Sequence, residues 1–159
     1  CSHLCEKFGG HKYAAGLSIK KENLQAFIDA FEIAVSQTIT KDQLSPKIEV
    51  DVEIDINDVD EKLFRIIKQF APFGPRNSSP VFISKGVMDN GYGKKLGTDK
   101  SHLRINAKTA SGSIAGIGFG MWNFFDKIKD YQEFDICYSI EENEWNGRKG
   151  LQLMLADIK

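Results

Sequence analysis

The order of the short apolar segments after Pro80 constrains the fold of this 159-residue chain more than any other feature. Three runs rich in β-branched and aromatic residues come first, and turn sequences containing Gly, Asp or Ser separate them, as is typical of antiparallel strands. A short helix and two more strands follow, with the turn sequence Asn146-Gly147 between these strands. The expected elements are strands at 81–97, 102–110 and 112–120, a helix at 121–131, and strands at 133–145 and 150–159.

Three strands, a helix and two strands is the order of an oligonucleotide-binding (OB) barrel. We therefore expect residues 81–159 to form a five-stranded antiparallel OB-fold barrel. In this fold the exposed face of strands two and three binds oligonucleotides or sugars, together with the loops between strands one and two and between strands four and five. Those loops are expected at Gly97–Ser101 and Glu142–Lys149.

Two aromatic residues of the expected barrel stand beside pairs of basic residues. An aromatic ring can stack on a base while neighbouring cations neutralise the phosphate. The alternative, that these rings complete the core, stays open because Trp and Tyr are often buried. The candidate groups are Tyr92 with Lys94 and Lys95, and Trp145 with Arg148 and Lys149.

The formal net charge of −1 hides one clearly basic stretch, residues 81–112. Nucleic-acid binding depends on local basic faces rather than on total charge. This stretch predicts a surface that follows a phosphate backbone, and the alternative is a solvated basic face without a ligand. Its basic residues are Lys85, Lys94, Lys95, Lys100, Arg104 and Lys108, against Asp89 and Asp99.

Residues 46–80 are expected to connect two units. Apolar and acidic residues alternate over residues 48–56, which is typical of a half-buried strand with its carboxylates in water. Asp58 and Glu61 resemble a capping box, and the apolar spacing after them predicts a helix. That helix ends before residues 71–80, whose three prolines predict a linker.

Residues 1–45 have the patterns of half of an α/β domain. Apolar residues at three-and-four spacing predict a helix from 21 to about 37, and the apolar residues 14–19 predict a short strand. The chain begins at Cys1 with no earlier element to pack against, so we expect a piece of a longer protein. The predicted class is α+β, with a partial α/β domain at 1–45, a connection at 46–80 and the barrel at 81–159.

The segment FGGHKYAAG, Phe8 to Gly16, resembles the glycine-glycine-histidine signature of the DHH-associated domain of DHH-family phosphoesterases. Consecutive glycines let the backbone approach a ligand closely, and amides at the start of a following short helix would face an anion. From spacing alone, a plain turn with a surface histidine is the alternative. The order of this signature, the linker sequence APFGPRNSSPVF and a barrel is similar to the carboxy-terminal part of the bacterial RecJ family of single-stranded-DNA-specific exonucleases.

This resemblance implies a parent enzyme that removes nucleotides from the 5′ end of single-stranded DNA in recombination and repair. Its Mn²⁺ or Mg²⁺ would be held by an amino-terminal DHH domain. Since no Asp-His-His occurs here, we expect this fragment to hold no metal or cofactor and to be inactive alone. The implied partners are single-stranded DNA, the DHH catalytic domain of the same parent and DNA-repair proteins. The residues implied to hold the strand are His11, as a phosphate contact in a composite active site, and Gly9, Gly10, Ala14, Ala15 and Gly16.

Two other hypotheses stay open. The half-domain could belong to another DHH-family phosphodiesterase or to an alanyl-tRNA synthetase, although such parents do not normally continue into a barrel of this kind. The barrel could instead be a protein-interaction module, because residues 113–159 carry a net negative charge. No apolar stretch is long enough for a membrane span and no signal peptide is recognisable, so we expect the cytoplasm.

Overall fold

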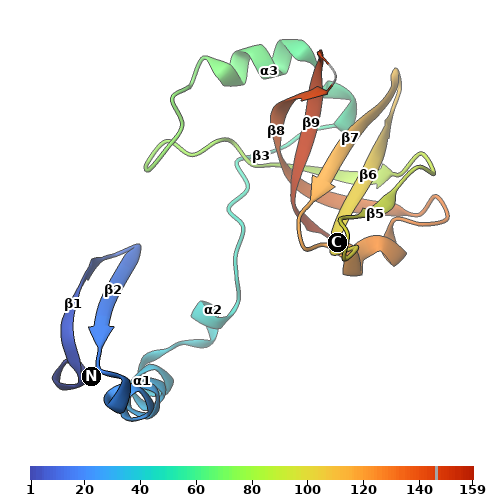
Figure 1. Cartoon of the computed structure of the whole chain (residues 1–159). Coiled ribbons are helices and arrows are strands. Elements are labelled where there is room, and N and C mark those ends of the chain that lie inside the picture. The colour runs from blue at the N-terminus through green and yellow to red at the C-terminus, as the bar shows by residue number, and fades with distance from the viewer. Residues whose placement is uncertain (146) are drawn as a thin grey trace. The chain divides into compact units, whose positions relative to one another are not determined.

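The computed structural model describes every residue except Asn146, and the side chains of Trp145 and Arg148 are also outside its description. The chain divides into two compact units, residues 1–47 and residues 48–159. Each unit is described by itself below (Figure 1).

Residues 1–47 form a β-hairpin and helices. In chain order they are η1 (Ser2–Leu4), β1 (Cys5–His11), β2 (Ala14–Ile19), η2 (Lys21–Asn23), α1 (Leu24–Thr38) and α2 (Lys41–Leu44). The helix predicted from 21 to about 37 is thus present as η2 and α1. None of these 47 residues is buried, and the exposed apolar side chains include Phe8, Leu17 and Phe31.

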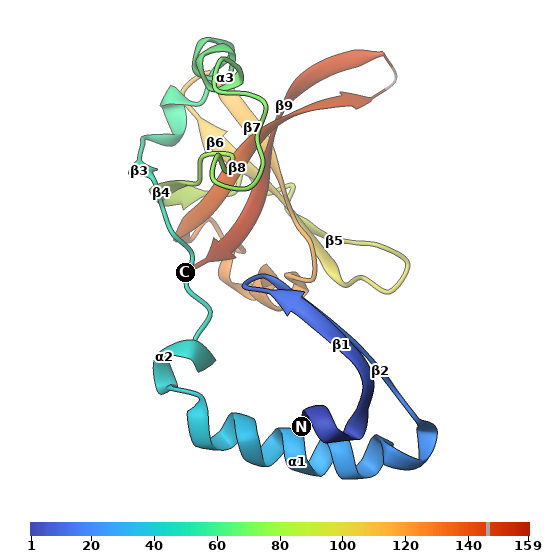
Figure 2. The same ribbon diagram turned by 90° about the vertical axis from the view of Figure 1, so that its left-hand side faces the viewer.

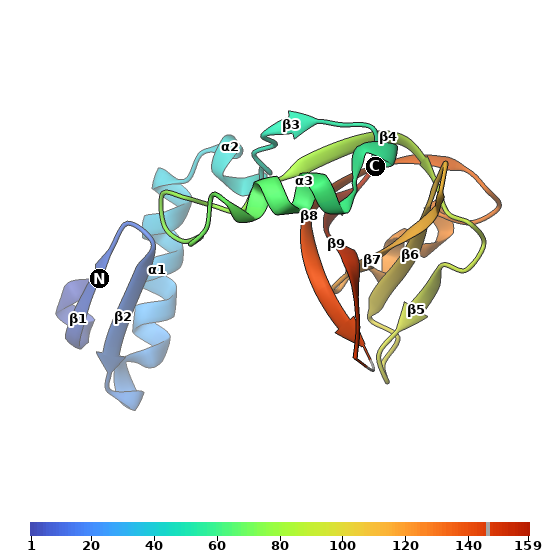
Figure 3. The ribbon, with the colours of Figure 1, turned by 90° about the horizontal axis from the view of Figure 1, so that it is seen from above.

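Residues 48–159 form a curved seven-stranded sheet. Its strands are β3 (Val52–Glu53), β4 (Phe82–Met88), β5 (Lys94–Leu96), β6 (His102–Thr109), β7 (Gly112–Gly118), β8 (Glu133–Trp145) and β9 (Arg148–Ile158). The order is β3-β4-β8-β9-β7-β6-β5. Figure 3 shows β8, β9, β7, β6 and β5 following one another around the barrel.

The expectation of a purely antiparallel five-stranded barrel is wrong in detail, because the sheet is mixed. β3 pairs in parallel with β4, and β7 pairs in parallel with β9. The second pairing arises because the chain passes through η4 (Trp122–Lys127) and β8 between β7 and β9, so that β9 returns in the direction of β7. The helix predicted at 121–131 is this shorter 3₁₀ element.

The barrel closes where the end of β4 meets β6, through a bridge rather than a long ladder. Asp89 and Ala107 form an isolated antiparallel bridge, and the Asn90 amide donates to the Asn106 carbonyl at 2.9 Å. The Asp89 residue is only 3% exposed, and its carboxylate accepts three backbone N–H bonds. The donors are Gly91 at 2.8 Å, Gly93 at 2.9 Å and Asn106 at 2.6 Å. One side chain therefore fixes both the turn after β4 and the closing contact.

Residues 48–80 contribute to the same core as the barrel. The alternating side chains of β6 that face inward, Leu103, Ile105 and Ala107, are fully buried. Phe64 and Ile67 of α3 (Glu61–Lys68) and Ile56 of η3 (Ile56–Asp58) belong to this core cluster. Figures 1 and 2 show α3 and the orange η4 at opposite ends of the barrel.

The strand predicted over residues 48–56 is much shorter in the structure. Among the described residues, only Val52 and Glu53 form ladder pairs with β4, although the adjacent amides of Asp51 and Ile54 also donate to the Val81 and Ile83 carbonyls. Asp51 accepts from the Val81 amide at 2.9 Å, and Asp55 accepts from the Asn57 amide at 2.8 Å and starts η3.

The predicted cap of the next helix is also displaced. The N-cap of α3 is Asp60 rather than Asp58, and its carboxylate accepts from the Leu63 amide at 2.7 Å. The residue nearest the first helical turn therefore takes the capping role. The helix ends before Pro72, as predicted.

Candidate nucleic-acid interface

A continuous groove crosses the outer face of β6, β7 and β9. The strand register places Arg104 opposite Ile117 and Asn106 opposite Ala115, and Ala115 lies opposite Gln152 of β9. Two adjoining hollows of about 450 and 610 Å³ share Arg104, Ala115 and two β9 residues, so we treat them together as the barrel groove. Its lining includes Arg104, Asn106, Ser113, Ala115, Ile117, Asn143, Lys149, Gly150, Leu151 and Gln152, with Asp60 and Glu61 at the α3 end.

Arg104 lies where the two hollows meet. It is half-buried, and its Nε is a buried nitrogen without a hydrogen-bond partner among the residues that the structure describes. A buried N–H left unpaired costs about 1–3 kcal/mol. The Arg104 side chain lines both hollows, and a guanidinium suits phosphate oxygens because its donors form a planar fork.

The predicted lysines are divided between two faces. Lys94 lies opposite Arg104 in the β5–β6 register and so belongs to the same face of the sheet. Lys95 points the other way, and its ammonium nitrogen lies 4.9 Å from the ring centre of Trp122. Lys100 is in the 97–101 loop with a positive φ of 55°, and Lys108 is exposed near the end of β6. Of the predicted lysines, only Lys149 lines the barrel groove among the described residues.

Tyr92 belongs to the connection between β4 and β5 and is 76% exposed. It does not line the barrel groove among the described residues. The segment from Asn90 to Gly93 is fixed by the bonds to Asp89, and the Tyr92 amide donates to the Asn90 side chain at 3.2 Å. Tyr92 is therefore an exposed ring on a fixed turn, and its stacking role stays a prediction.

The loop predicted at Glu142–Lys149 is instead a long β-hairpin. Glu142 pairs with Leu151 and Glu144 with Lys149, so that β8 and β9 continue almost to the turn. Gly147 has a φ of 75°, the left-handed conformation that glycine adopts readily. Asn146 lies outside the described residues, as do the side chains of Trp145 and Arg148. The predicted roles of those two side chains therefore stay predictions.

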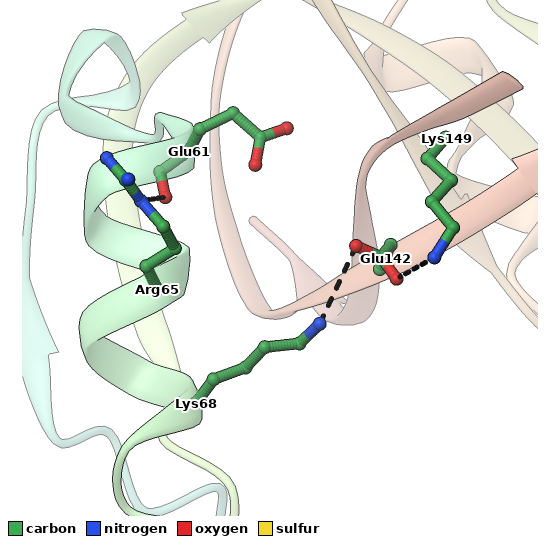
Figure 4. A network of polar contacts seen from close by, with 5 residues as sticks. All are labelled: Glu61, Arg65, Lys68, Glu142 and Lys149. Atoms are coloured by element: carbon green, nitrogen blue, oxygen red, sulfur yellow. Dashed lines mark hydrogen bonds and ion pairs between the residues drawn. The ribbon is translucent and has the colours of Figure 1, made fainter.

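An ion-pair network that the sequence analysis missed connects this hairpin to α3 (Figure 4). The Glu142 carboxylate lies 3.2 Å from the Lys149 ammonium and 3.5 Å from the Lys68 ammonium. Lys149 lowers the pKa of Glu142 by a hydrogen bond and by its charge, and Lys68 adds its charge. The contribution of these pairs to stability is present above the ordinary carboxyl pKa and is lost as the pH falls through the lowered value. Glu142 thus competes with any phosphate for Lys149.

Replacing Glu142 by Gln is expected to strengthen binding of single-stranded DNA by roughly 2- to 5-fold at low salt, because it releases two lysines from exposed ion pairs. Fluorescence anisotropy with a labelled oligonucleotide measures the effect, which is expected to shrink at high salt. Glu53→Gln is the matched control, since Glu53 forms a similarly exposed pair with Lys85 on β4, outside the groove lining. An equal gain in both variants would refute a local role for Glu142.

The glycine-histidine motif does not precede a helix, contrary to the expectation. Gly9, Gly10 and His11 are in β1 and pair with Gly16, Ala15 and Ala14 of β2. Small residues on both strands let the backbones approach: a Cβ on Gly10 would lie 2.6 Å from the Ala14 carbonyl oxygen. The motif therefore does not provide backbone amides at the start of a helix for binding an anion. The His11 ring is exposed, and its Nδ1 accepts from the Tyr13 amide at 3.2 Å.

Gly10→Ala is expected to disrupt the β1–β2 hairpin, because the new methyl group would collide with backbone atoms of β2; overpacking of this kind typically costs about 1–3 kcal/mol. Gly9→Ala is the matched control, since nothing lies within 4 Å of a Cβ at that position. Amide hydrogen exchange in residues 5–19 distinguishes them. Faster exchange is expected in Gly10→Ala only, and unchanged exchange there would contradict the steric argument.

Among the described residues, no group of three or more His, Cys, Asp or Glu side chains gathers within reach of one ion. No helix in the described part of the chain is long and apolar enough to cross a membrane.

Comparisons with known proteins agree with this architecture. The family model described as the RecJ OB domain matches residues 50–157. The chain is 27% identical to the single-stranded-DNA-specific exonuclease RecJ of Bacillus subtilis over 158 residues, which cover 99% of this chain and 20% of that protein. It is also 27% identical to RecJ of Haemophilus influenzae over 156 residues, covering 96% of this chain and 27% of that protein. The chain thus spans about a fifth to a quarter of the length of these relatives.

Solved structures of RecJ share the fold. RecJ from Thermus thermophilus in complex with Mn²⁺ superposes with a TM-score of 0.66 and 21% identity, over 99% of this chain and 22% of that one. The Mg²⁺ complex of the same protein gives a TM-score of 0.66 over 23% of its chain. Since the family model covers more than half of the sequence, this chain belongs to the RecJ OB domain family.

Proposed function

We propose that this chain is the substrate-binding part of a RecJ-like exonuclease and that it binds single-stranded DNA in the barrel groove. The observation that carries the proposal is the position of Arg104, with an unpaired buried Nε among the described residues at the centre of a groove on the face where OB folds bind oligonucleotides. Ile117 and Leu151 beside it offer apolar contact surface for bases.

The parent enzyme is proposed to remove nucleotides from the 5′ end of single-stranded DNA, in recombination and repair in the cytoplasm. The names of the relatives from Bacillus subtilis and Haemophilus influenzae support the substrate. The Mn²⁺ and Mg²⁺ complexes of the Thermus thermophilus protein support a metal-dependent reaction in the parent. The metal ligands are proposed to lie in a DHH catalytic domain outside this sequence, and the fragment is proposed to be inactive alone.

Residues 1–47 are proposed to contact that catalytic domain. This unit leaves Phe8, Leu17 and Phe31 exposed, and contiguous apolar surface of this kind marks interaction sites. His11 and the glycines beside it are proposed to contact phosphates of the strand near the metals. Their exposure on the β1–β2 hairpin is compatible with a composite site.

The test is fluorescence anisotropy of the 159-residue chain with a labelled single strand and with its duplex, over a series of salt concentrations. Preferential binding of the single strand is expected, with an affinity that falls steeply with salt because phosphate contacts release counterions. Trp145→Ala is expected to weaken binding if this side chain stacks on a base, by about 1–3 kcal/mol. No binding of either form at low salt would reject the proposal and favour the barrel as a protein-interaction module.

A further inference from the structure

Two large aromatic side chains follow β7 directly and remain exposed. Phe119 is 65% exposed and Trp122 is 50% exposed. Neither lines the barrel groove among the described residues, and neither carries a role in the proposed function so far. Both occur in the short segment that leads from β7 into η4.

Phe119 comes directly after β7 and contacts a side chain of the face on which the groove lies. Because side chains alternate along a strand, His102, two residues before Arg104 in β6, faces the same way as Arg104. In the β6–β7 register Leu103 lies opposite Gly118, which places His102 next to Phe119. Their ring centres are 5.1 Å apart with an interplanar angle of 77°, an edge-to-face contact. The row of Arg104 and Ile117 is thus followed by the row of His102 and Phe119.

Each ring is contacted by a neighbouring side chain and keeps part of its surface open. The His102 Nδ1 accepts from the Gly120 amide at 3.1 Å, so the histidine that contacts the Phe119 ring is itself held. The Lys95 ammonium lies over the Trp122 ring. Rings held in place lose little conformational freedom when a ligand stacks on them, which favours binding.

The charge around these rings suits a phosphate backbone. Lys94 and Lys95 alternate on β5, so that one is on the groove face and the other contacts Trp122. Lys100 belongs to the adjacent 97–101 loop. The nearby acid Asp99 accepts from the Ser101 amide, and Asp126 is paired with Lys129. β5 therefore carries one cation on the groove face and one beside Trp122.

We propose that Phe119 and Trp122 stack on unpaired bases of the same strand that occupies the barrel groove. The nucleic-acid path then runs from Arg104 past the 97–101 loop onto the surface of η4. This inference rests on the proposed function, since it requires a single strand in the groove, and it assigns a longer footprint than the groove alone provides.

Trp122 supplies a direct reporter. The chain contains two tryptophans, so the Trp145→Phe variant leaves Trp122 as the single indole. Oligothymidylates of about 6 and about 12 nucleotides, within the range of OB-fold site sizes, are titrated until anisotropy reaches its plateau. The longer oligonucleotide is expected to quench the Trp122 fluorescence, and the shorter one to quench it less.

Phe119→Ala tests the second ring independently of fluorescence. It is expected to lower affinity for the longer oligonucleotide roughly 5-fold or more, the effect of one lost base–aromatic stack, with a smaller change for the shorter one. Phe70→Ala is the matched control, because Phe70 is 62% exposed in the same unit but follows α3. The Phe70→Ala variant is expected to bind both oligonucleotides with the affinity of the unsubstituted 159-residue chain.

The outcomes separate this inference from the proposed function. If anisotropy shows binding but Trp122 is not quenched and Phe119→Ala binds the longer oligonucleotide normally, the extended path is wrong and the groove proposal stands. If Phe70→Ala loses as much affinity as Phe119→Ala, the effect is not local and the extended path is also rejected. If no oligonucleotide binds, both proposals fail.

Discussion

Asp89→Ala is expected to lower the free energy of unfolding of the barrel by roughly 3–5 kcal/mol, because three backbone donors lose a buried charged acceptor at once. Those donors are Gly91, Gly93 and Asn106. Since domains of this size are stable by only about 5–15 kcal/mol, the variant should be marginally folded. Urea unfolding followed by tryptophan fluorescence measures the change, as both tryptophans, Trp122 and Trp145, belong to the barrel unit.

Asp99→Ala is the matched control for this experiment. Asp99 also accepts from a backbone amide two residues later, that of Ser101 at 3.1 Å, but it is exposed. Its replacement is expected to cost less than about 1 kcal/mol, because water can replace the lost acceptor. Similar losses in the two variants would show that burial of the Asp89 carboxylate is not the cause.

Arg104→Ala is expected to weaken binding of single-stranded DNA roughly 10- to 100-fold, the loss of about 1.5–3 kcal/mol that a hydrogen bond to a charged group contributes. The slope of log affinity against log salt should fall by about 0.7, the value for one lost phosphate contact on a single strand. The stability of the free protein should be unchanged or slightly higher, because the substitution removes a buried Nε that has no partner among the described residues.

Arg65→Ala is the matched control for Arg104→Ala. Arg65 is exposed on α3 and its Nε already donates to the Glu61 carbonyl at 3.3 Å. It is expected to change affinity by less than about 2-fold, as an exposed charge contributes little. A loss of stability in Arg104→Ala that matches its loss of affinity would indicate a structural role instead of a phosphate contact.

Much of the barrel could be predicted from the sequence, because its signals are local. Turn residues separate the strands, and alternation in β6 places Leu103 and Ile105 inside, opposite in direction to Arg104. The parallel pairing of β7 with β9 and the closing bridge at Asp89 depend on contacts between distant segments, which periodicity does not encode. The strand over 48–56 was overpredicted at its end because Asp55 caps η3, an interaction that hydrophobic alternation does not reveal.

The candidate site was predicted less completely than the fold. Arg104 and Lys149 were selected from charge and lie in the groove, whereas Lys95 faces Trp122. Alternation from Arg104 would have indicated Asn106 on the same face. Lys68 and Glu142 could not be paired in advance, since they belong to different elements 74 positions apart and meet only after the hairpin and α3 are in place. The short helix expected after the glycine-histidine motif is absent from the described residues, because Gly10 allows close backbone pairing of β1 with β2.

The closing bridge between β4 and β6 has a consequence for self-association. In a barrel that is closed by a single bridge, the facing edges of the two strands are protected only while that bridge is intact. If the Asp89 contact opens, the backbone groups of β4 and β6 that face each other become available to strands of other molecules. Conditions that weaken this contact should therefore produce strand-exchanged oligomers or aggregates before the rest of the barrel unfolds.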